Sequence, residues 1–280
     1  MSFYPQPNKY QCGPFALKYA LVMLGVFASE KSIAKKAGSS WWAGTDEIGL
    51  ARAAKAYDCR LKYFRRETGV DGIKALIQHL KKGYPCILSV DEWGHWLTVI
   101  NWQQGKFILI DSSEVKKVIH IYTTQQIINR WKYIDPDDEF KSFDGYALVP
   151  NFKPKTRAKF TLAKARYVMQ KKNNDLAKHW DTYFNDLISI CKPRTATSIH
   201  TISFGEFLRR YEKMIIEEVV YWHGVPSYDE LRKIVAKMKF IADVYNLIIY
   251  IDEHKKALVD ITSLLMMYAC GKYGMEKIYV

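Results

Sequence analysis

The sequence predicts an α+β domain over residues 1–150, a linker over residues 151–157 and an all-helical domain over residues 158–280. Three observations lead to this division. Apolar residues recur at helical spacing near the N-terminus, and short β-rich runs between turns then dominate up to Val149. Helices followed by strands in this way are typical of α+β folds. Beyond a basic segment that contains Pro154, helical spacing returns and persists.

The helices near the N-terminus have recognisable start signals. Pro14 fits the first turn of a helix over residues 13–25, because the amide that proline lacks has no intrahelical partner there. A short helix is expected over residues 32–37. Thr45 is a suitable N-cap for a helix that runs to Tyr57, with acidic residues in its first turn.

The rest of the first domain alternates between strands and helices. We expect strands over residues 60–64, 85–90, 95–102, 106–111, 115–122 and 145–149, and helices over residues 70–82 and 124–131. In the second domain we expect helices over residues 160–169, 176–190, 204–221, 228–254 and 256–270, with negligible strand content. The apolar stripes of these last helices are typical of the core of a bundle.

Composition and charge narrow the classes of function. The chain is 49% hydrophobic and carries a net charge of +13, and the basic excess is spread through both regions. Since no finger, basic-zipper or RNA-recognition motif accompanies this charge, the sequence argues against a nucleic-acid partner. The N-terminus resembles no signal peptide and no apolar run is long enough to cross a bilayer, so we expect a cytoplasmic protein without a membrane span.

The five cysteines and seven histidines do not predict a disulfide framework or a metal site. The cysteines are widely spaced, no C-x-x-C pair occurs, and the histidines lack the spacing of metal ligands. We therefore expect no metal and no cofactor. Most of the cysteines lie in apolar contexts that are typical of buried side chains, but Cys12 does not.

Cys12 follows a polar loop and begins the first predicted helix. The free amides and the dipole at a helix N-terminus stabilise a thiolate, which is the nucleophilic form of cysteine. The backbone amide of Cys12 can point at a developing oxyanion, and Gly13 leaves room for a substrate. Gln6, a neutral donor on the same loop, is a candidate for a second contact in this oxyanion hole.

A histidine and a carboxylate lie where such a nucleophile would need them. His95 begins an apolar strand and can act as the base that a thiol requires. Asp111 ends the next strand, and a three-residue hairpin loop over residues 103–105 would put Leu97 opposite Asp111, on the face that carries His95. A carboxylate in this position can orient the imidazole. A register slip of one residue would turn Asp111 to the opposite face.

Taken together, these residues resemble the bacteriocin-processing cysteine peptidases that cut double-glycine leaders, and their stand-alone relatives of papain-like fold. The resemblance covers residues 3–150. It is carried by Gln6, the run Cys12-Gly-Pro-Phe-Ala-Leu, Gly44-Thr45 with Leu50 and Ala53-Ala54, Gly-His95-Trp-Leu-Thr-Val, and the strand ending at Asp111. It implies a papain-like fold in which Cys12 is the nucleophile, His95 the general base and acid, Asp111 the orienting residue and Gln6 an oxyanion-hole donor.

The sequence departs from this family at two positions beside the candidate site. Gln11 precedes the nucleophile, where the family commonly has an acid, and Ser112 follows Asp111, where proline is common. Both departures leave the substrate class open. Because neither a membrane span nor a phosphate-binding G-x-x-x-x-G-K loop occurs in these 280 residues, the resemblance does not imply leader processing coupled to export.

Three functions are compatible with the sequence. The first is a hydrolase that acts on a peptide or isopeptide bond of a peptide or protein substrate. The second is a glutamine deamidase or acyltransferase that uses the same triad, since a thiolate and an imidazole do not dictate which amide enters. The third is a non-catalytic peptidase-like module whose helical region docks a protein partner. Trp41 and Trp42, in a polar loop, are weaker candidates for lining a substrate groove.

Overall fold

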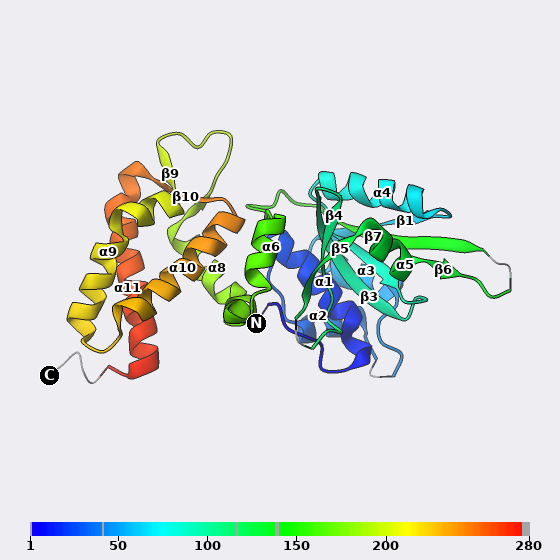
Figure 1. Cartoon of the computed structure of the whole chain (residues 1–280), viewed down its shortest axis with the longest axis horizontal. Coiled ribbons are helices and arrows are strands. Elements are labelled where there is room, and N and C mark those ends of the chain that lie inside the picture. Colours follow the sequence, from blue (N-terminus) through cyan, green and yellow to red (C-terminus); the bar gives the residue numbers. More distant parts are fainter. Residues whose placement is uncertain (1, 41, 116, 138–139, 276–280) are drawn as a thin grey trace. The chain divides into compact units, whose positions relative to one another are not determined.

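A computed structural model of the chain describes residues 2–40, 42–115, 117–137 and 140–275 (Figure 1). The chain divides into two compact units, Met1–His179 and Trp180–Val280. The first unit contains all the candidate catalytic residues.

The first unit begins with the helices α1 (Cys12–Met23), α2 (Glu30–Ala37) and α3 (Glu47–Lys55). Every residue of α1 is buried, which is typical of a helix enclosed by other elements on all sides. The predicted cap of α3 was wrong by one residue. The N-cap is Asp46, whose carboxylate accepts a hydrogen bond from the amide of Gly49.

A seven-stranded antiparallel sheet forms the centre of the first unit. Its strand order is β1-β7-β2-β3-β4-β5, and β6 pairs with β7. The helices α4 (Gly69–Lys81) and α5 (Thr124–Trp131) belong to the same unit. The strands are β1 (Cys59–Arg66), β2 (Cys86–Val90), β3 (His95–Gln103), β4 (Lys106–Ile110), β5 (Ile119–Thr123), β6 (Tyr133–Ile134) and β7 (Lys141–Pro150). The predicted α+β class is confirmed.

The two faces of the sheet contribute to separate apolar cores. Ile87 of β2 packs in one cluster with residues of α1, α2 and α3, whereas its neighbour Leu88 packs in another with residues of α4 and α5. This alternation follows from the two-residue period of a strand. Burial of one such side chain contributes about 1.5–3 kcal/mol. The helix that begins at Cys12 is thereby fixed against one face of the sheet, the arrangement expected of a papain-like domain.

The hairpin between β3 and β4 decides which way Asp111 faces. Its loop is shorter than predicted, because Gln103 pairs with Lys106 and only Gln104 and Gly105 lie between them, both with positive φ. Alone, this register would turn Asp111 away from the face that carries His95.

A bulge in β3 restores the predicted pairing. The register shifts by one residue between Val99 and Asn101, after which Thr98 pairs with Ile110. The next position along β3, Leu97, is therefore opposite Asp111, as the sequence predicted from a different loop. The bulge returns Asp111 to the face of His95.

Residues 151–179 pack with the first unit, so the structural division falls later than the predicted linker. The guanidinium of Arg157 donates to the carbonyls of Lys82 and Gly83, and the Asn101 amide donates to the carbonyl of Phe160 at 2.6 Å. This segment contains the helices α6 (Leu162–Val168) and α7 (Asn174–Lys178). These bonds join the segment to the sheet domain, and its role as a linker stays a prediction.

The second unit is helical, as predicted, with one correction. Its helices include α8 (Trp180–Ile190), α9 (Phe204–His223), α10 (Tyr228–Val244) and α11 (His254–Tyr273). It also contains a small sheet of order β8-β10-β9, formed by β8 (Lys192–Pro193), β9 (Thr201–Ser203) and β10 (Leu247–Tyr250). The expectation of negligible strand content was therefore wrong.

The third strand of this sheet interrupts the helix that was predicted over residues 228–254. Asn246 has a φ of 53°, a left-handed conformation that asparagine tolerates and that ends α10. The following Leu-Ile-Ile-Tyr run then pairs with β9 and is rich in residues that favour strands. Among the described residues, none of the helices has the length and apolarity that a membrane crossing requires.

Candidate active site

Cys12 lies at the first position of the buried helix α1 and is 6% exposed. A short 3₁₀ turn, Lys9–Gln11, leads into it, and the Asn8 side chain caps this turn. Gly13 follows in close contact with α3, since a Cβ atom at this position would lie 2.8 Å from the Cβ of Thr45. The thiol is thus held at a helix N-terminus, where the dipole favours a negative charge.

His95 and Asp111 form a direct pair. The distance from His95 Nε2 to Asp111 Oδ1 is 2.7 Å, and Asp111 is fully buried at the end of β4. Asp111 also accepts hydrogen bonds from the backbone amide and the hydroxyl of Ser113, at 2.9 and 2.7 Å. These donors satisfy a carboxylate that would otherwise be costly to bury.

The thiol completes a chain of three side chains. Cys12 lies close enough to the His95 imidazole to raise its pKa. Because Nε2 of His95 faces Asp111, Nδ1 is the ring nitrogen left for the sulfur. The structure therefore places Cys12 and Asp111 beside the His95 ring, and the catalytic roles of the three residues stay a prediction.

The charges of this group favour a protonated imidazole. Burial alone lowers the pKa of His95, but its hydrogen bonds to Asp111 and to Cys12, with their charges, raise that pKa to about 9. Burial alone raises the pKa of Asp111, but its contacts with His95, Arg130 and Ser113 hold that pKa well below the usual 3.8. An imidazolium next to a carboxylate can hold a proton that a leaving group needs.

Arg130 is a residue of the site that the sequence analysis missed. It lies in the last turn of α5, and its Nη1 donates to Asp111 Oδ2 at 2.8 Å. The rest of its guanidinium binds both carboxylate oxygens of Asp91. In the sequence, its one signal is a basic residue at a helix end, where interaction with the dipole is the usual explanation.

In the described parts of the chain, no group of three or more histidine, cysteine, aspartate or glutamate side chains is arranged to hold a metal ion.

The N-terminal part of the chain matches a known protein family. Residues 1–138 match the Peptidase_C39 like family. The N-terminal region is therefore similar to this family. A comparison with curated proteins gives no match.

Solved structures similar to the chain include C39 peptidases. The peptidase domain of Streptococcus ComA, a bi-functional ABC transporter, is 18% identical and the match covers 53% of this chain and 98% of that domain, with a TM-score of 0.39. A double glycine motif protease from an AMS/PCAT transporter, in complex with the leader peptide, is 15% identical over 51% and 89%, also at 0.39. A C39-like peptidase from Bacillus anthracis is 12% identical over 54% and 95%, at 0.39.

Gln6 is attached to the residue that follows Asp111. Its Oε1 accepts from the Ser112 hydroxyl at 2.5 Å, and its backbone amide donates to the Ser112 carbonyl at 2.9 Å. Its Nε2 donates to the Asn8 carbonyl at 2.8 Å. Ser112 thus helps to hold Gln6 in place. The oxyanion-hole role of Gln6 stays a prediction.

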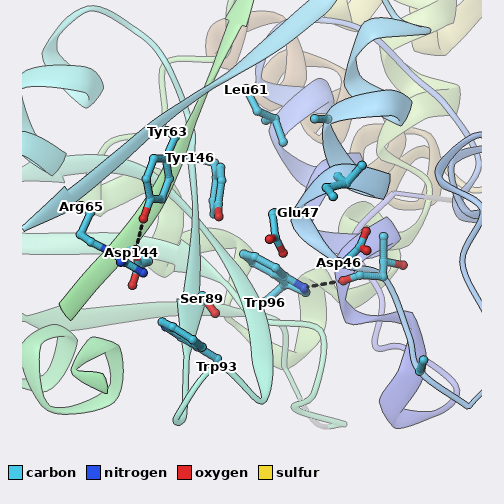
Figure 2. Close-up of a pocket in the computed structure, with 14 residues that line it drawn as sticks. Asp46, Glu47, Leu61, Tyr63, Arg65, Ser89, Trp93, Trp96, Asp144 and Tyr146 are labelled. Atoms are coloured by element: carbon cyan, nitrogen blue, oxygen red, sulfur yellow. Dashed lines mark hydrogen bonds and ion pairs between the residues drawn. The ribbon is translucent and has the colours of Figure 1, made fainter. Parts of the chain in front are cut away.

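Trp42, one of the two tryptophans that the sequence suggests for a substrate groove, is not among the residues that line the cavity described below. Trp41 lies outside the described residues, and Trp42 is 64% exposed. The groove role of both residues stays a prediction. A cavity of about 790 Å³ is instead lined by other aromatic residues, among them Trp93 and Trp96, as Figure 2 shows. The sequence offered no signal for this cavity beyond the position of Trp96 next to His95.

Proposed function

We propose that the chain is a cysteine peptidase-type hydrolase that cleaves a peptide or isopeptide bond with Cys12, His95 and Asp111. The observation that carries the proposal is the contact chain from the Cys12 thiol through the His95 ring to the buried carboxylate of Asp111. The match of residues 1–138 to the C39-like family supports the same class of chemistry.

The proposed reaction has two halves. The Cys12 sulfur, after its proton has passed to His95, attacks the substrate carbonyl carbon, and the resulting oxyanion lies near the helix N-terminus. The tetrahedral adduct collapses, the C–N bond breaks, and the imidazolium gives its proton to the leaving amine. Water then loses a proton to His95 and attacks the thioester, which releases the acid and regenerates the thiol. Asp111 keeps the imidazole oriented throughout.

Labelling with iodoacetamide at neutral pH tests the nucleophile. Three other cysteines should resist, because burial raises the pKa of Cys59 to about 11 and that of Cys191 to about 12, and raises the pKa of Cys86 still further. We expect mass spectrometry to find the label mainly on Cys12, at a rate that falls at least about tenfold in His95→Ala.

Cys270→Ser is the matched control, because Cys270 is partly exposed and lies in the second unit. This variant should leave the labelling of Cys12 unchanged. Slow and uniform labelling of all cysteines would contradict the proposal and favour a non-catalytic binding module.

A peptide mixture from casein distinguishes the reactions open to the same triad. After incubation with the chain, new peptide ends indicate cleavage, whereas the mass gain of glutamine to glutamate without new ends indicates deamidation. Cys12→Ala, incubated in parallel, removes the background of contaminating peptidases. Deamidation alone would overturn the assignment to peptide cleavage but keep the nucleophile.

A further inference from the structure

The cavity of about 790 Å³ has an unusual lining for a protein of net charge +13. Three carboxylates and one guanidinium face it, together with four large aromatic side chains (Figure 2). The charged groups are Asp46, Glu47, Asp144 and Arg65, and the aromatic ones are Tyr63, Trp93, Trp96 and Tyr146. The cavity is therefore locally acidic and aromatic on a basic protein.

Two segments next to the candidate active site lead into the cavity, although neither Cys12 nor His95 is among the residues that line it. Trp96 directly follows His95, and its indole Nε1 donates to the carbonyl of Thr45 at 2.9 Å. Thr45 in turn packs against Gly13, the residue after Cys12. A peptide with one bond at Cys12 would thus have a neighbouring side chain within reach of this cavity.

One end of the cavity already holds a cation between a carboxylate and aromatic rings. Arg65 Nε lies 2.7 Å from Asp144 Oδ1, which also accepts from the Tyr63 hydroxyl at 2.5 Å. The Arg65 guanidinium lies over the rings of Tyr63 and Trp93, at 6.0 and 5.8 Å from their centroids. Its charge is matched by that of Asp144.

The other end of the cavity also has a carboxylate beside aromatic rings, but no cation lies among the described residues that line it there. Figure 2 shows Glu47 beside Trp96 and Tyr146, whose rings contact each other edge to face with their centroids 5.7 Å apart. Burial raises the pKa of Tyr146, and the nearby charge of Glu47 raises it further. The Glu47 carboxylate forms no hydrogen bond or ion pair with any residue that the structure describes. Asp46 is engaged as the cap of α3.

We propose that Glu47, Trp96 and Tyr146 form a subsite for a basic side chain of the peptide substrate, with arginine preferred. The inference rests on the proposed peptidase function, since it assigns a specificity to the same site. A planar guanidinium can stack on the indole while it donates to the carboxylate, as Arg65 does at the other end. The negative charge of Glu47 would then attract basic peptides, although the positive net charge of the protein repels them.

Binding to the full-length Cys12→Ala variant tests this subsite without any chemistry. The probes are two acetylated hexapeptide amides of glycine and alanine, one with a central arginine and the other with citrulline, which has nearly the same shape but no charge. Titration is followed by the NMR signals of the tryptophan indole N–H groups. We expect the arginine peptide to bind about tenfold more tightly, because cation–π and ion-pair contacts add.

Variants at two exposed carboxylates locate the effect. Glu47→Gln in the Cys12→Ala background should abolish the preference for arginine. Glu67→Gln, at an exposed position that does not line the cavity, should preserve it. Circular dichroism checks that both variants are folded.

Three results would each overturn the subsite: equal affinities for the two peptides, no binding of the arginine peptide, or an arginine preference that persists in Glu47→Gln. These results are independent of the labelling experiment on Cys12. A preference for arginine without selective labelling of Cys12 would refute the peptidase function but keep the subsite. Selective labelling of Cys12 without a preference for arginine would refute the subsite but keep the peptidase function.

Discussion

Arg130 connects two loops that both adjoin the imidazole. It binds Asp111, the partner of His95, and it also holds Asp91, in the turn just before His95. In that turn Asp91, Glu92 and Trp93 have φ values of 55°, 57° and 63°, which are unfavourable for residues other than glycine. The backbone amide of Asp91 donates to the Arg130 carbonyl at 2.8 Å. Arg130 thus stabilises both the carboxylate of Asp111 and the strained turn over residues 91–93.

Replacement of Arg130 should destabilise the first unit. Arg130→Gln leaves the buried Asp111 with less compensation, and the loss of one partner of a buried pair costs about 3–5 kcal/mol, reduced here because Arg130 is partly exposed. We expect a loss of about 2 kcal/mol or more in the free energy of unfolding, measured with guanidinium chloride.

Arg130→Lys is the matched control. It keeps the charge but not the fork that reaches two carboxylates, so it should restore only part of the stability. If Arg130→Gln has the same free energy of unfolding as the unchanged protein, the bridge from Arg130 to Asp111 and Asp91 contributes nothing to stability.

The raised pKa of His95 makes stability depend on pH. The folded-state pKa of about 9 lies above the ordinary 6.5, so the folded state binds the proton more tightly than the unfolded state. This contribution is fully present below pH 6.5 and is lost as the pH rises through about 9. The difference in unfolding free energy between the unchanged protein and His95→Gln should therefore shrink over that window. If this difference in unfolding free energy stays constant from about pH 6 to about pH 10, His95 and Asp111 do not stabilise each other as a charged pair.

At this scale the sequence predicts the candidate catalytic residues but not the residues that hold them in place. Cys12, His95 and Asp111 each follow a recognisable local signal, such as a helix start or a strand end. The contacts of Arg130 and of Ser112 depend on how distant segments pack, and no spacing along the chain reports them. The cavity residue Glu47 was interpreted only as a favourable charge in the first turn of a helix.

Among the elements, α5 is the one that positions Arg130. Its first turn has a capping box, in which the Thr123 hydroxyl accepts from the Gln126 amide and the Gln126 side chain accepts from the Thr123 amide. Residues 124–131 were predicted as a helix, and the boundaries agree with α5. Such agreement is expected where capping signals are local.

Loss of this cap should weaken the helix by a small amount. Thr123→Ala removes the hydroxyl and should lower the free energy of unfolding by about 1 kcal/mol, measured by thermal or denaturant unfolding. Thr123→Ser keeps the hydroxyl and should lose much less. Equal losses in the two variants would indicate that the methyl group, and not the cap, stabilises this end.

The hairpin of β3 and β4 shows the limit of prediction at this scale. The predicted pairing of Asp111 with Leu97 was correct, but the predicted loop was one residue too long, because the bulge near Val99 was not expected. Bulges have no reliable sequence signal, since they depend on how the two strands twist and pack. The break at Asn246 was missed for a related reason, because helical spacing continued through a residue that adopts a left-handed conformation.

At the scale of the whole chain, the sequence predicts the class of each region but not the extent of the first unit. Residues 158–179 contain helices, which placed them with the helical region on pattern alone, and residues 151–157 were expected to be a linker. The structure joins this segment to the sheet domain through the N-terminal residues, where the Phe3 amide donates to the Ala177 carbonyl at 3.0 Å and the Phe3 ring contacts Phe160. Such long-range contacts are not visible in the periodicity of a sequence.

Truncated chains test this division. A fragment of residues 1–179 should unfold cooperatively and label at Cys12 like the full chain, because it keeps the contacts of α6 and α7 with the sheet domain. A fragment of residues 1–150 exposes Phe3 and the apolar surface that Phe160 covers, so it should be less stable or aggregate. Equal unfolding midpoints for the two fragments would place the boundary at the predicted linker instead.

The bulge in β3 has a consequence for how this gene can diverge. Since each strand residue faces the side opposite to its neighbour, the gain or loss of a single codon within the hairpin would turn Asp111 away from His95 without altering either residue. Descendants that keep the pair of His95 and Asp111 should therefore change this hairpin in length only when a second, compensating change arises in the same two strands.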